Sequence, residues 1–323
     1  AMLSVSVVIL TQGTRNEDLH HIWADVLGQT VKPKNIVTVV NCESVDLGVV
    51  PAGITVVETG VNLGIPAGRN YGVRGLAATP GQESDLILFI DDDAYILGSD
   101  FIERAIKIFE ANEKLGLVQP KVVTRIGQSD ETQESGPRYW IPRANKTPTF
   151  ETFPAFSVWE GATVIRWNCF IESNGWAEPI FYAHEGTDLA WRVWNTGFET
   201  RYEPRLVVSH PPVGPERHDK SIWFGMRNKV VMARRNLPFP FLVIYPLAWF
   251  ALDFVKIMIG KIPHPSGKYA IKTQLRELFK GLFAGIRMDL SDQGHVFDAA
   301  AVRRKLSWRT IGVMTKHGRP PLI

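Results

Sequence analysis

Hydrophobic positions in the first two-thirds of the chain follow two alternating patterns. Short apolar runs rich in β-branched residues, typical of buried parallel strands, occupy residues 4–10, 34–42, 53–59, 85–90, 159–167 and 201–210. Apolar side chains recur at helical spacing over residues 17–28, 67–78, 101–112 and 184–195. Strands that alternate with helices predict an α/β domain whose mostly parallel sheet has both faces covered. Ligands of such sheets bind beyond the C-terminal ends of the strands.

Two stretches depart from this alternation. Residues 125–155 are rich in polar residues, proline and glycine, which is typical of a long surface loop that shapes a substrate site. Residues 237–260 are strongly apolar and aromatic and approach the roughly 20 residues of a spanning helix, but three prolines, Asp253 and Lys256 interrupt them. Three arrangements remain open: helices lying on a membrane surface, a core helix packed on the sheet domain, and a membrane-spanning helix.

Charge distinguishes the last third of the chain from the rest, whereas the overall composition is ordinary. With 45% hydrophobic and 21% charged residues, the composition is that of a globular protein, neither fibrous nor disordered. From Arg217 onward, 19 Lys and Arg stand against 6 Asp and Glu, a net charge of +13, whereas the preceding residues carry −10. We therefore expect a sheet domain over residues 1–215 and a basic helical region over residues 216–323. An anionic membrane surface or an acidic acceptor is the expected partner of that region, and no nucleic-acid motif occurs.

Cysteine usage and the first residues bear on location. Cys42 and Cys169 lack metal-ligand spacing and indicate reduced, buried thiols, as in the cytoplasm. Residues 1–10 lack the basic and long apolar segments of a secretory signal. We expect a cytoplasmic protein whose basic region contacts the inner face of the cell membrane.

Three consecutive aspartates, Asp91 to Asp93, end the strand-like run at residues 85–90. Neighbouring carboxylates repel one another, and a divalent cation that prefers oxygen ligands, Mg²⁺ or Mn²⁺, would relieve that repulsion. In an extended backbone Asp91 and Asp93 point to the same side, so that one could bind the metal and the other the nucleotide. Asp92 would point the other way, in a structural role. The same spacing is also typical of a solvated turn, but its place at a strand end favours a metal site.

Two further segments carry candidate binding groups. Residues 60–73 combine four glycines, which permit close backbone approach, with Arg69. Arg69 can bind a phosphate or the paired aspartates, or can remain a surface cation. His210 ends a strand-like run, where it could be structural or could complete a metal shell, and imidazole suits Mn²⁺ better than Mg²⁺.

Carboxylates also gather where the helical pattern at residues 184–195 begins. Glu185 and Asp188 are three residues apart and can share one side of the first turn. A carboxylate here could deprotonate an acceptor hydroxyl. For Asp188, a helix cap or a structural pair with Arg192 is the favoured interpretation.

Taken together and in this order, these segments resemble glycosyltransferase family 2, which comprises inverting enzymes with the GT-A fold. The matching residues are Thr11, Arg15, Leu19, Gln29, Thr30, Asn62, Gly64, Arg69, Asn70, Gly72, Asp91, Asp93, Gly161, Ala162, Arg166, Glu185, Asp188, Leu189, Arg192, Tyr202, Pro204 and His210. The chain departs from the family pattern at Asn41, which replaces a base-binding aspartate, and at Gly186, which replaces the second acid of a Glu-Asp pair. The basic last third is similar to actinobacterial members with a membrane-associated tail.

The resemblance implies a fold, a reaction and a set of site residues. The fold is the GT-A nucleotide-sugar-binding fold, a Rossmann-like sheet flanked by helices, here with a helical C-terminal extension. The reaction is inverting transfer of a sugar from a nucleotide-diphosphate sugar to a hydroxyl of a glycan or lipid-linked acceptor. Glu185 is the implied base, and Asp93 and His210 are the implied ligands of Mn²⁺ or Mg²⁺. Donor contacts are implied for Thr11, Arg15, Asn41, Asn62, Arg69, Asp91, Asp92 and Gly161, and acceptor contacts for Trp159, Glu160, His184 and Asp188.

Two alternatives remain beside this interpretation. A sugar-phosphate nucleotidyltransferase uses a similar platform, but it usually has a glycine-rich basic loop after the first strand. The loop at residues 11–18 has a single glycine, which argues against it. A non-catalytic membrane-associated binding module is supported only by the two departures, Asn41 and Gly186.

Overall fold

The computed structural model describes residues 2–127, 131–133, 150–212, 220–262 and 270–317. The strands are β1 (Val5–Thr11), β2 (Asn35–Val40), β3 (Thr55–Glu58), β4 (Leu86–Asp91), β5 (Tyr95–Ile96), β6 (Leu115–Arg125), β7 (Thr132–Gln133), β8 (Phe153–Pro154), β9 (Ala162–Arg166) and β10 (Glu199–His210). The helices are α1 (Asn16–Leu27), α2 (Ile65–Ala77), α3 (Phe101–Glu110), α4 (Trp167–Glu172), the short 3₁₀ helix η2 (Glu178–Ile180), α5 (Glu185–Thr196), α6 (Ser221–Asn236), α7 (Phe241–Met258), α8 (Ala270–Arg287), α9 (Ala299–Val302) and α10 (Trp308–Lys316).

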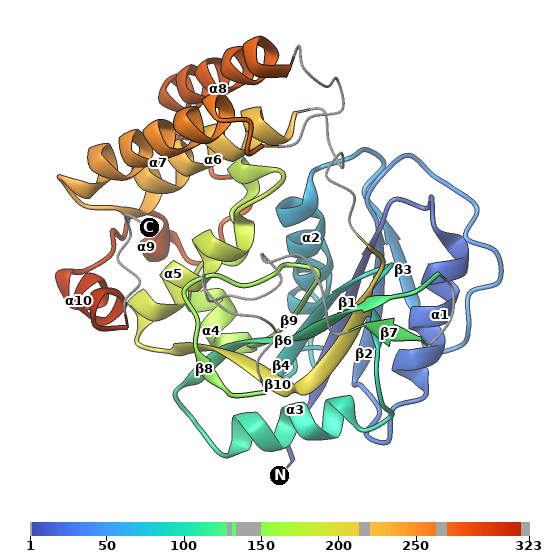
Figure 1. Cartoon of the computed structure of the whole chain (residues 1–323). Coiled ribbons are helices and arrows are strands. Elements are labelled where there is room, and N and C mark those ends of the chain that lie inside the picture. Colours follow the sequence, from blue (N-terminus) through green and yellow to red (C-terminus); the bar gives the residue numbers. More distant parts are fainter. Residues whose placement is uncertain (1, 128–130, 134–149, 213–219, 263–269, 318–323) are drawn as a thin grey trace.

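One mixed sheet organises the first two-thirds of the chain (Figure 1). Its strand order is β3-β2-β1-β4-β9-β6-β10-β5. Strands β1 to β4 pair in parallel, and β6 pairs in parallel with β10. β9 lies antiparallel between β4 and β6. The mostly parallel sheet expected from the sequence is confirmed, and β9 runs opposite to the direction that a purely parallel pattern implies.

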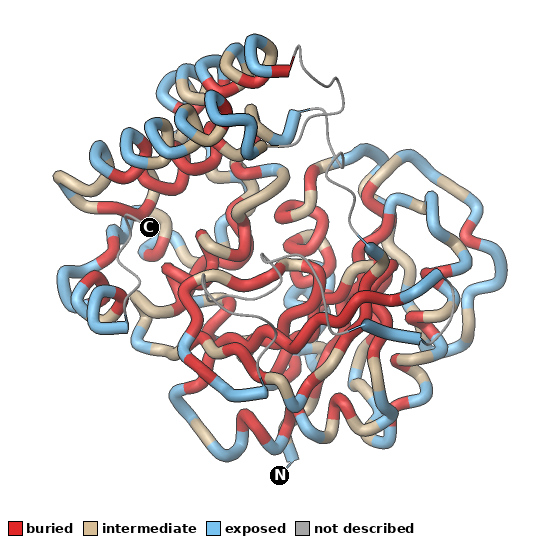
Figure 2. Tube along the Cα trace, viewed as in Figure 1, coloured by how far each residue is buried: buried red, intermediate tan, exposed pale blue. Residues whose placement is uncertain are grey.

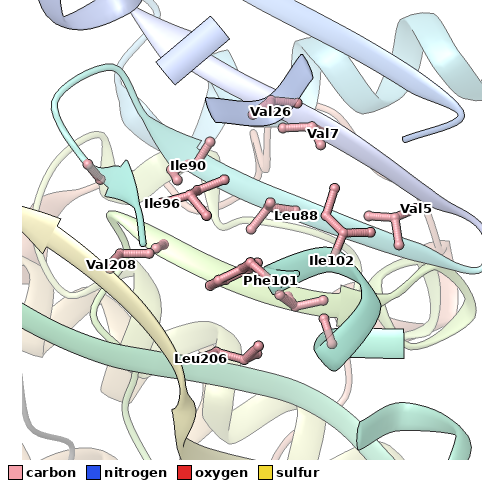
Figure 3. Close-up of a cluster of buried hydrophobic side chains, with 14 of the residues drawn as sticks. Val5, Val7, Val26, Leu88, Ile90, Ile96, Phe101, Ile102, Leu206 and Val208 are labelled. Atoms are coloured by element: carbon pink, nitrogen blue, oxygen red, sulfur yellow. The ribbon is translucent and has the colours of Figure 1, made fainter. Parts of the chain in front are cut away.

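Two apolar clusters hold the helices to the sheet. On one face, α1 and α3 pack against side chains such as Val7 and Leu88 (Figure 3). On the other face, α2, α4 and α5 cover Val8, Phe89 and their neighbours. Because successive strand side chains point to opposite faces, the apolar runs β1 and β4 supply both clusters at once.

Strand β6 was not predicted from the sequence, although all eleven of its residues are buried. Gln119, Pro120 and Lys121 interrupt its apolar pattern. The two polar side chains are accommodated individually: Gln119 Oε1 accepts a hydrogen bond from the backbone of Trp159 (2.6 Å), and Lys121 Nζ lies 4.2 Å from the centre of the Phe150 ring. β6 ends at Arg125, where the surface loop expected at residues 125–155 begins. Most of that loop lies outside the described residues.

The helices of the last third form a layer beyond α5 rather than a cover for the sheet (Figure 1). α7 packs against α6 and α8, and its buried residues are Tyr245, Pro246 and Ile257. The outward sides of α7 and α8 are exposed (Figure 2). The core-helix interpretation of residues 237–260 is therefore wrong, because only 17% of α7 is buried. Within the described residues, α7 is the one helix that is long and apolar enough to cross a membrane.

Polar contacts fix this layer to the sheet domain. The amide of Asn236 donates to Asp188 of α5 at 2.7 Å, and the backbone of Phe297 donates to Asn174 at 2.7 Å. The backbone of His295 also donates to Glu178, at 2.9 Å. The helical region is thus anchored beside α5, and its division from the sheet domain near residue 215 stays a prediction.

Candidate active site

The chemistry-bearing residues meet at the C-terminal edge of the parallel strands. Thr11, Asp91 and His210 are the last residues of β1, β4 and β10. Because β9 runs antiparallel, its beginning lies at the same edge, and the carbonyl of Gly161 accepts a hydrogen bond from the backbone of Asp91 at 2.9 Å. Arg69 enters from α2, and Glu185 begins α5. The edge is therefore built from six elements that are distant in sequence.

Each of the three aspartates pairs with an arginine, and Arg15 is shared by Asp92 and Asp93. Strand β4 ends at Asp91, and the chain then turns, so the extended backbone expected through Asp93 is wrong. Asp91 accepts from Arg69 at 2.8 Å. Asp92 is buried and accepts from Thr11 at 2.7 Å and from Arg15 at 3.1 Å, in the structural role predicted for it. Burial, followed by the neighbouring charge of Asp93, raises the pKa of Asp92 to about 7.

Asp93 and His210 form a pair suited to a cation. Asp93 Oδ1 lies 3.3 Å from His210 Nε2, while Asp93 Oδ2 pairs with Arg15 at 2.9 Å. His210 Nδ1 is 2.8 Å from the carbonyl oxygen of Pro211, which can only accept, so Nδ1 donates its proton to that oxygen. Nε2 is then the ring nitrogen that faces the Asp93 carboxylate. An imidazole nitrogen and a carboxylate oxygen this close together are a pair of ligands that one divalent cation can share.

Within the described residues, no group of three or more His, Cys, Asp or Glu side chains forms a ready-made metal cage. A site with one carboxylate and one imidazole leaves most of the coordination shell to other oxygens. That is the arrangement in which Mg²⁺ or Mn²⁺ is completed by water and substrate phosphate. The donor set at Asp93 and His210 therefore fits the predicted metal, provided that the substrate supplies further ligands.

Arg69 connects the aspartates to α5. Its side chain is 1% exposed and lies 4.8 Å from the centre of the Trp176 ring. Besides its bond to Asp91, its Nη1 lies 4.0 Å from Oε1 of Glu185. Within the described part of the chain, Nε and Nη1 of Arg69 and Oε2 of Glu185 make no hydrogen bond. Buried polar atoms without partners are costly, and they are expected where a ligand completes the site.

Glu185 is a buried carboxyl with unusual basicity. Its side chain is 2% exposed. Burial, and after it the charge of Glu160, raises the pKa of Glu185 to about 8, although Arg69 opposes this shift. A carboxylate with a pKa near the operating pH is well matched to general-base catalysis. The neighbouring His184 is neutral, since burial and then Lys229 lower its pKa to about 3.

The entry to α5 is strained and is held from α6. Phe181, Ala183 and His184 all have positive φ angles, of 65°, 65° and 69°. The amide of Asn228 donates to the carbonyl of Ala183 at 2.9 Å and also to that of Tyr182. Left-handed backbone at non-glycine residues persists only where the surroundings enforce it. Asn228 therefore helps to hold Glu185 in place, a role that no local sequence signal reveals.

The side chains of Asn41 and Asn62 hold the loop that precedes α2 through hydrogen bonds to its backbone. Asn41 Nδ2 donates to the carbonyl of Gly64 at 2.9 Å, and its Oδ1 accepts from the backbone of Leu63 at 3.0 Å. Asn62 Oδ1 accepts from the backbone of Gly64 at 2.9 Å. These bonds set the start of the helix that carries Arg69, and donor contacts by the two asparagines stay a prediction.

Two residues matched by resemblance lie away from the open edge. Asp188 is fully buried, and its oxygens bind Arg192 (2.6 Å) and Asn236 (2.7 Å). The structural pair with Arg192 is confirmed, and Asp188 presents no oxygen to an acceptor. Arg166 lies at the opposite end of β9, where it donates to backbone carbonyls including that of Leu115 (2.7 Å). Arg166 therefore lies away from the edge at which the other matched residues gather.

Comparisons with known proteins find likeness in structure alone. No protein-family model and no curated protein matches the chain by sequence. A structure of GalNAc-T7 with UDP, GalNAc and Mn²⁺ superposes with a TM-score of 0.57 at 12% identity, covering 87% of this chain and 55% of that one. The chain thus spans about half the length of that protein.

Two shorter proteins are covered more fully. S. aureus TarS 1–349 gives a TM-score of 0.51 at 14% identity, over 90% of this chain and 77% of that one. The mannosyltransferase PcManGT from Pyrobaculum calidifontis, in complex with GDP-Man and Mn²⁺, gives 0.50 at 14% identity, over 98% and 80%. These neighbours are GT-A-type glycosyltransferases. This chain therefore has the GT-A glycosyltransferase fold, a mixed sheet flanked by helices, extended by a C-terminal helical region.

Proposed function

We propose that this chain is an inverting glycosyltransferase of the family 2 type, which transfers a sugar from a nucleoside-diphosphate sugar to an acceptor hydroxyl. One observation carries the proposal: the Asp93–His210 pair, Arg69 and Glu185 converge at the edge of the sheet where ligands of α/β folds bind. The neighbours of the same fold, crystallised with UDP or GDP-mannose and Mn²⁺, support a donor of this class.

Two arginines lie on the donor side of the site, where negative charge would develop. Arg15 and Arg69 each hold an aspartate near the strand ends, and within the described residues Arg69 keeps two guanidinium nitrogens without hydrogen bonds. Those nitrogens are suited to bind the oxygens of a diphosphate. Asp93 and His210 would hold the metal, which, when bound, neutralises charge on the leaving diphosphate. Thr11 and Asp92 keep Arg15 oriented through their shared hydrogen bonds.

Glu185 is the proposed base. As the acceptor oxygen forms its bond to the anomeric carbon, the hydroxyl proton passes to Glu185. The bond from that carbon to the diphosphate oxygen breaks at the same time, and the leaving group keeps its electron pair. A single in-line displacement inverts the anomeric configuration. Trp159, Glu160 and His184 are proposed to line the acceptor side.

The acceptor is proposed to be a glycan or a lipid-linked molecule at the inner face of an anionic membrane. α7 and α8 adjoin through Phe250 and Phe279, whose ring centres are 5.0 Å apart. Both expose apolar side chains: Val243, Ile244, Leu247, Leu252, Val255 and Met258 on α7, and Ile271, Phe279, Phe283 and Ile286 on α8. A hollow of about 580 Å³ beside them is lined by three aromatic side chains (Trp223, Phe279, Phe283) and three cationic ones (Arg276, Lys280, Arg287). Exposed aromatic and basic side chains together fit an anionic lipid surface.

Incubation with a panel of UDP- and GDP-sugars and Mn²⁺ tests the proposed reaction. We expect release of UDP or GDP from one donor, and we expect proton NMR to find the inverted configuration at the anomeric carbon of the product. Glu185→Gln should lower that rate by about 10²- to 10⁴-fold, because the base is lost while the donor contacts remain. Glu203→Gln, at a buried carboxylate paired with Arg205, is the matched control.

Three outcomes would contradict the proposed reaction. The first is the absence of turnover with every donor of the panel. The second is full activity of Glu185→Gln. The third is pyrophosphate release from a nucleoside triphosphate and a sugar phosphate, which would favour the nucleotidyltransferase instead.

A further inference from the structure

A second acidic side chain lies beside Glu185. Glu160 lies two residues before the start of β9, which faces the site. Its Oε1 accepts a hydrogen bond from the backbone of Gly186 at 2.9 Å. Gly186 is the second residue of α5 and follows Glu185 directly. Glu160 therefore holds the first turn of the helix that carries the proposed base, from a segment 26 residues earlier in the chain.

Position 186 has no room for an acid of its own. A Cβ atom on Gly186 would lie 2.2 Å from the carbonyl oxygen of Val158 and 2.9 Å from Cγ of Glu160. It would also lie 3.0 Å from the Glu160 carboxylate. Real Cβ atoms do not approach backbone oxygens so closely. The space that a side chain at position 186 would fill is thus occupied by Glu160.

The charges that face this pair come from three elements. Arg69 of α2 approaches Glu185 to 4.0 Å but is already hydrogen-bonded to Asp91 of β4. His184, at the start of α5, is neutral for the reasons given above. Among the described residues, one guanidinium therefore faces three carboxylates, and the charge of Glu160 disfavours ionisation of Glu185. Burial also raises the pKa of Glu160, against the hydrogen bonds from the backbone of Gly186 and of Glu160 itself and against the charge of Arg69.

We propose that Glu160 supplies the second acidic group of the site in place of residue 186: it positions Glu185 through Gly186 and places a negative charge beside it that makes Glu185 a stronger base. The inference rests on the proposed function of Glu185. During transfer, Glu185 accepts the proton of the acceptor hydroxyl. Once the product has left, that proton passes to water, and the pair returns to its initial charge. Glu160 acts through Glu185 and is a positioning residue.

Carbon-13 NMR of the side-chain carboxyls in the free, full-length protein tests the coupling directly and needs no substrate. In the wild type, the signals of Glu160 and Glu185 should each titrate in two steps, because each group senses the charge of the other. Two independent single-step curves would overturn the proposal, whether or not any variant folds.

Variants then assign the direction of the effect. Glu160→Gln keeps an oxygen for the backbone of Gly186 but removes the charge, so the titration midpoint of Glu185 should fall by about one pH unit or more. Glu160→Asp, which keeps the charge, should leave most of the elevation in place. Glu203→Gln, distant in the sheet, should leave the midpoint unchanged. An unchanged midpoint in Glu160→Gln would contradict the proposal.

The pH dependence of turnover links the coupling to catalysis. With the UDP- or GDP-sugar that the wild type uses, the acidic limb of the kcat/KM profile should move to lower pH in Glu160→Gln, and the plateau rate should fall because the base is weaker. A purely structural role would lower the rate without moving the limb. If the wild type turns over no donor, the proposed function fails, while the NMR result still decides the coupling of the two carboxyls.

Discussion

At the scale of single residues, the site gains its reactivity from buried carboxyl groups that outnumber the cationic side chains described beside them. Glu185 and Asp92 both have pKa values well above those of ordinary carboxyls, and in both cases burial is the largest cause. Such groups are unfavourable for the folded state when they are ionised. Within the described residues, atoms of Arg69 and Glu185 are buried without hydrogen-bond partners, which costs the folded protein free energy. Binding of substrate and metal would recover that free energy.

This balance predicts a pH dependence of stability. The pKa of Glu185 rises from an ordinary value of 4.5 to about 8 on folding. Between these two pH values the folded state binds more protons at Glu185 than the unfolded state does, so stability falls as the pH rises. Glu185→Gln should remove part of this slope and should melt at a higher temperature than the wild type near the upper end of the window. Thermal unfolding curves of the free protein across that window measure it, and parallel curves for both proteins would contradict it.

Residue types at strand ends were the most predictable part of the site. Asp91, Asp93, Arg69 and His210 were selected because each stands at the end or the entry of an element, and the structure brings them to one edge. Partners that come from distant segments were not predictable, because only the folded chain brings them near. The bond from Gly186 to Glu160 and the support that Asn228 gives to the entry of α5 belong to this class.

At the scale of elements, the loop before α2 decides where Arg69 points. Gly64 has a φ of 88°, and a Cβ there would lie 2.8 Å from the carbonyl oxygen of Phe181. Gly64→Ala should therefore destabilise the protein by about 1–3 kcal/mol. Gly75→Ala, in the same helix with no atom within 4 Å of the new Cβ, should instead stabilise it by about 0.5–1 kcal/mol. Urea unfolding of the two variants measures these free energies, and equal stabilities would contradict a special backbone requirement at Gly64.

The elements themselves were predicted where the apolar period is uninterrupted. β1, β2, β4 and the helices α1 and α3 follow from their patterns, since each is a continuous run or a regular stripe. β6 was not predicted because its buried polar residues break the apolar pattern. Tertiary contacts that the sequence does not reveal satisfy these residues one by one. The direction of β9 could not be predicted either. An apolar strand has the same sequence pattern whether it pairs parallel or antiparallel with β4 and β6.

At the scale of the whole molecule, the exposed sides of α7 and α8 bear on whether the apolar helix α7 belongs to the core or faces a membrane. A helix that packs on a core would be mostly buried, whereas 17% of α7 is buried. α7 lies next to α8, whose aromatic and basic side chains line the hollow described above. The charge asymmetry of the sequence and the exposed apolar side chains therefore coincide on one region, which we propose as the membrane-facing side.

Vesicle co-sedimentation tests this surface. The protein should bind vesicles that contain phosphatidylglycerol more tightly than vesicles of phosphatidylcholine alone, and salt should weaken the binding. Replacing both Phe279 and Phe283 with serine should weaken binding by about tenfold, through the loss of inserted apolar area. Val49→Ser, at an 85% exposed residue between β2 and β3, is the control and should bind as the wild type does. Equal binding by all three proteins would contradict a role for α8.

The position of the metal in a crystal grown with Mn²⁺ and either UDP or GDP tests the proposed site most directly. We expect an anomalous scattering peak for a metal bound by both the Asp93 carboxylate and His210 Nε2, with diphosphate oxygens completing its shell beside Arg69. Asp93→Asn should lose that peak. A nucleotide bound at this edge with no peak beside Asp93, or a peak at a different group of carboxylates, would contradict a metal site at Asp93 and His210.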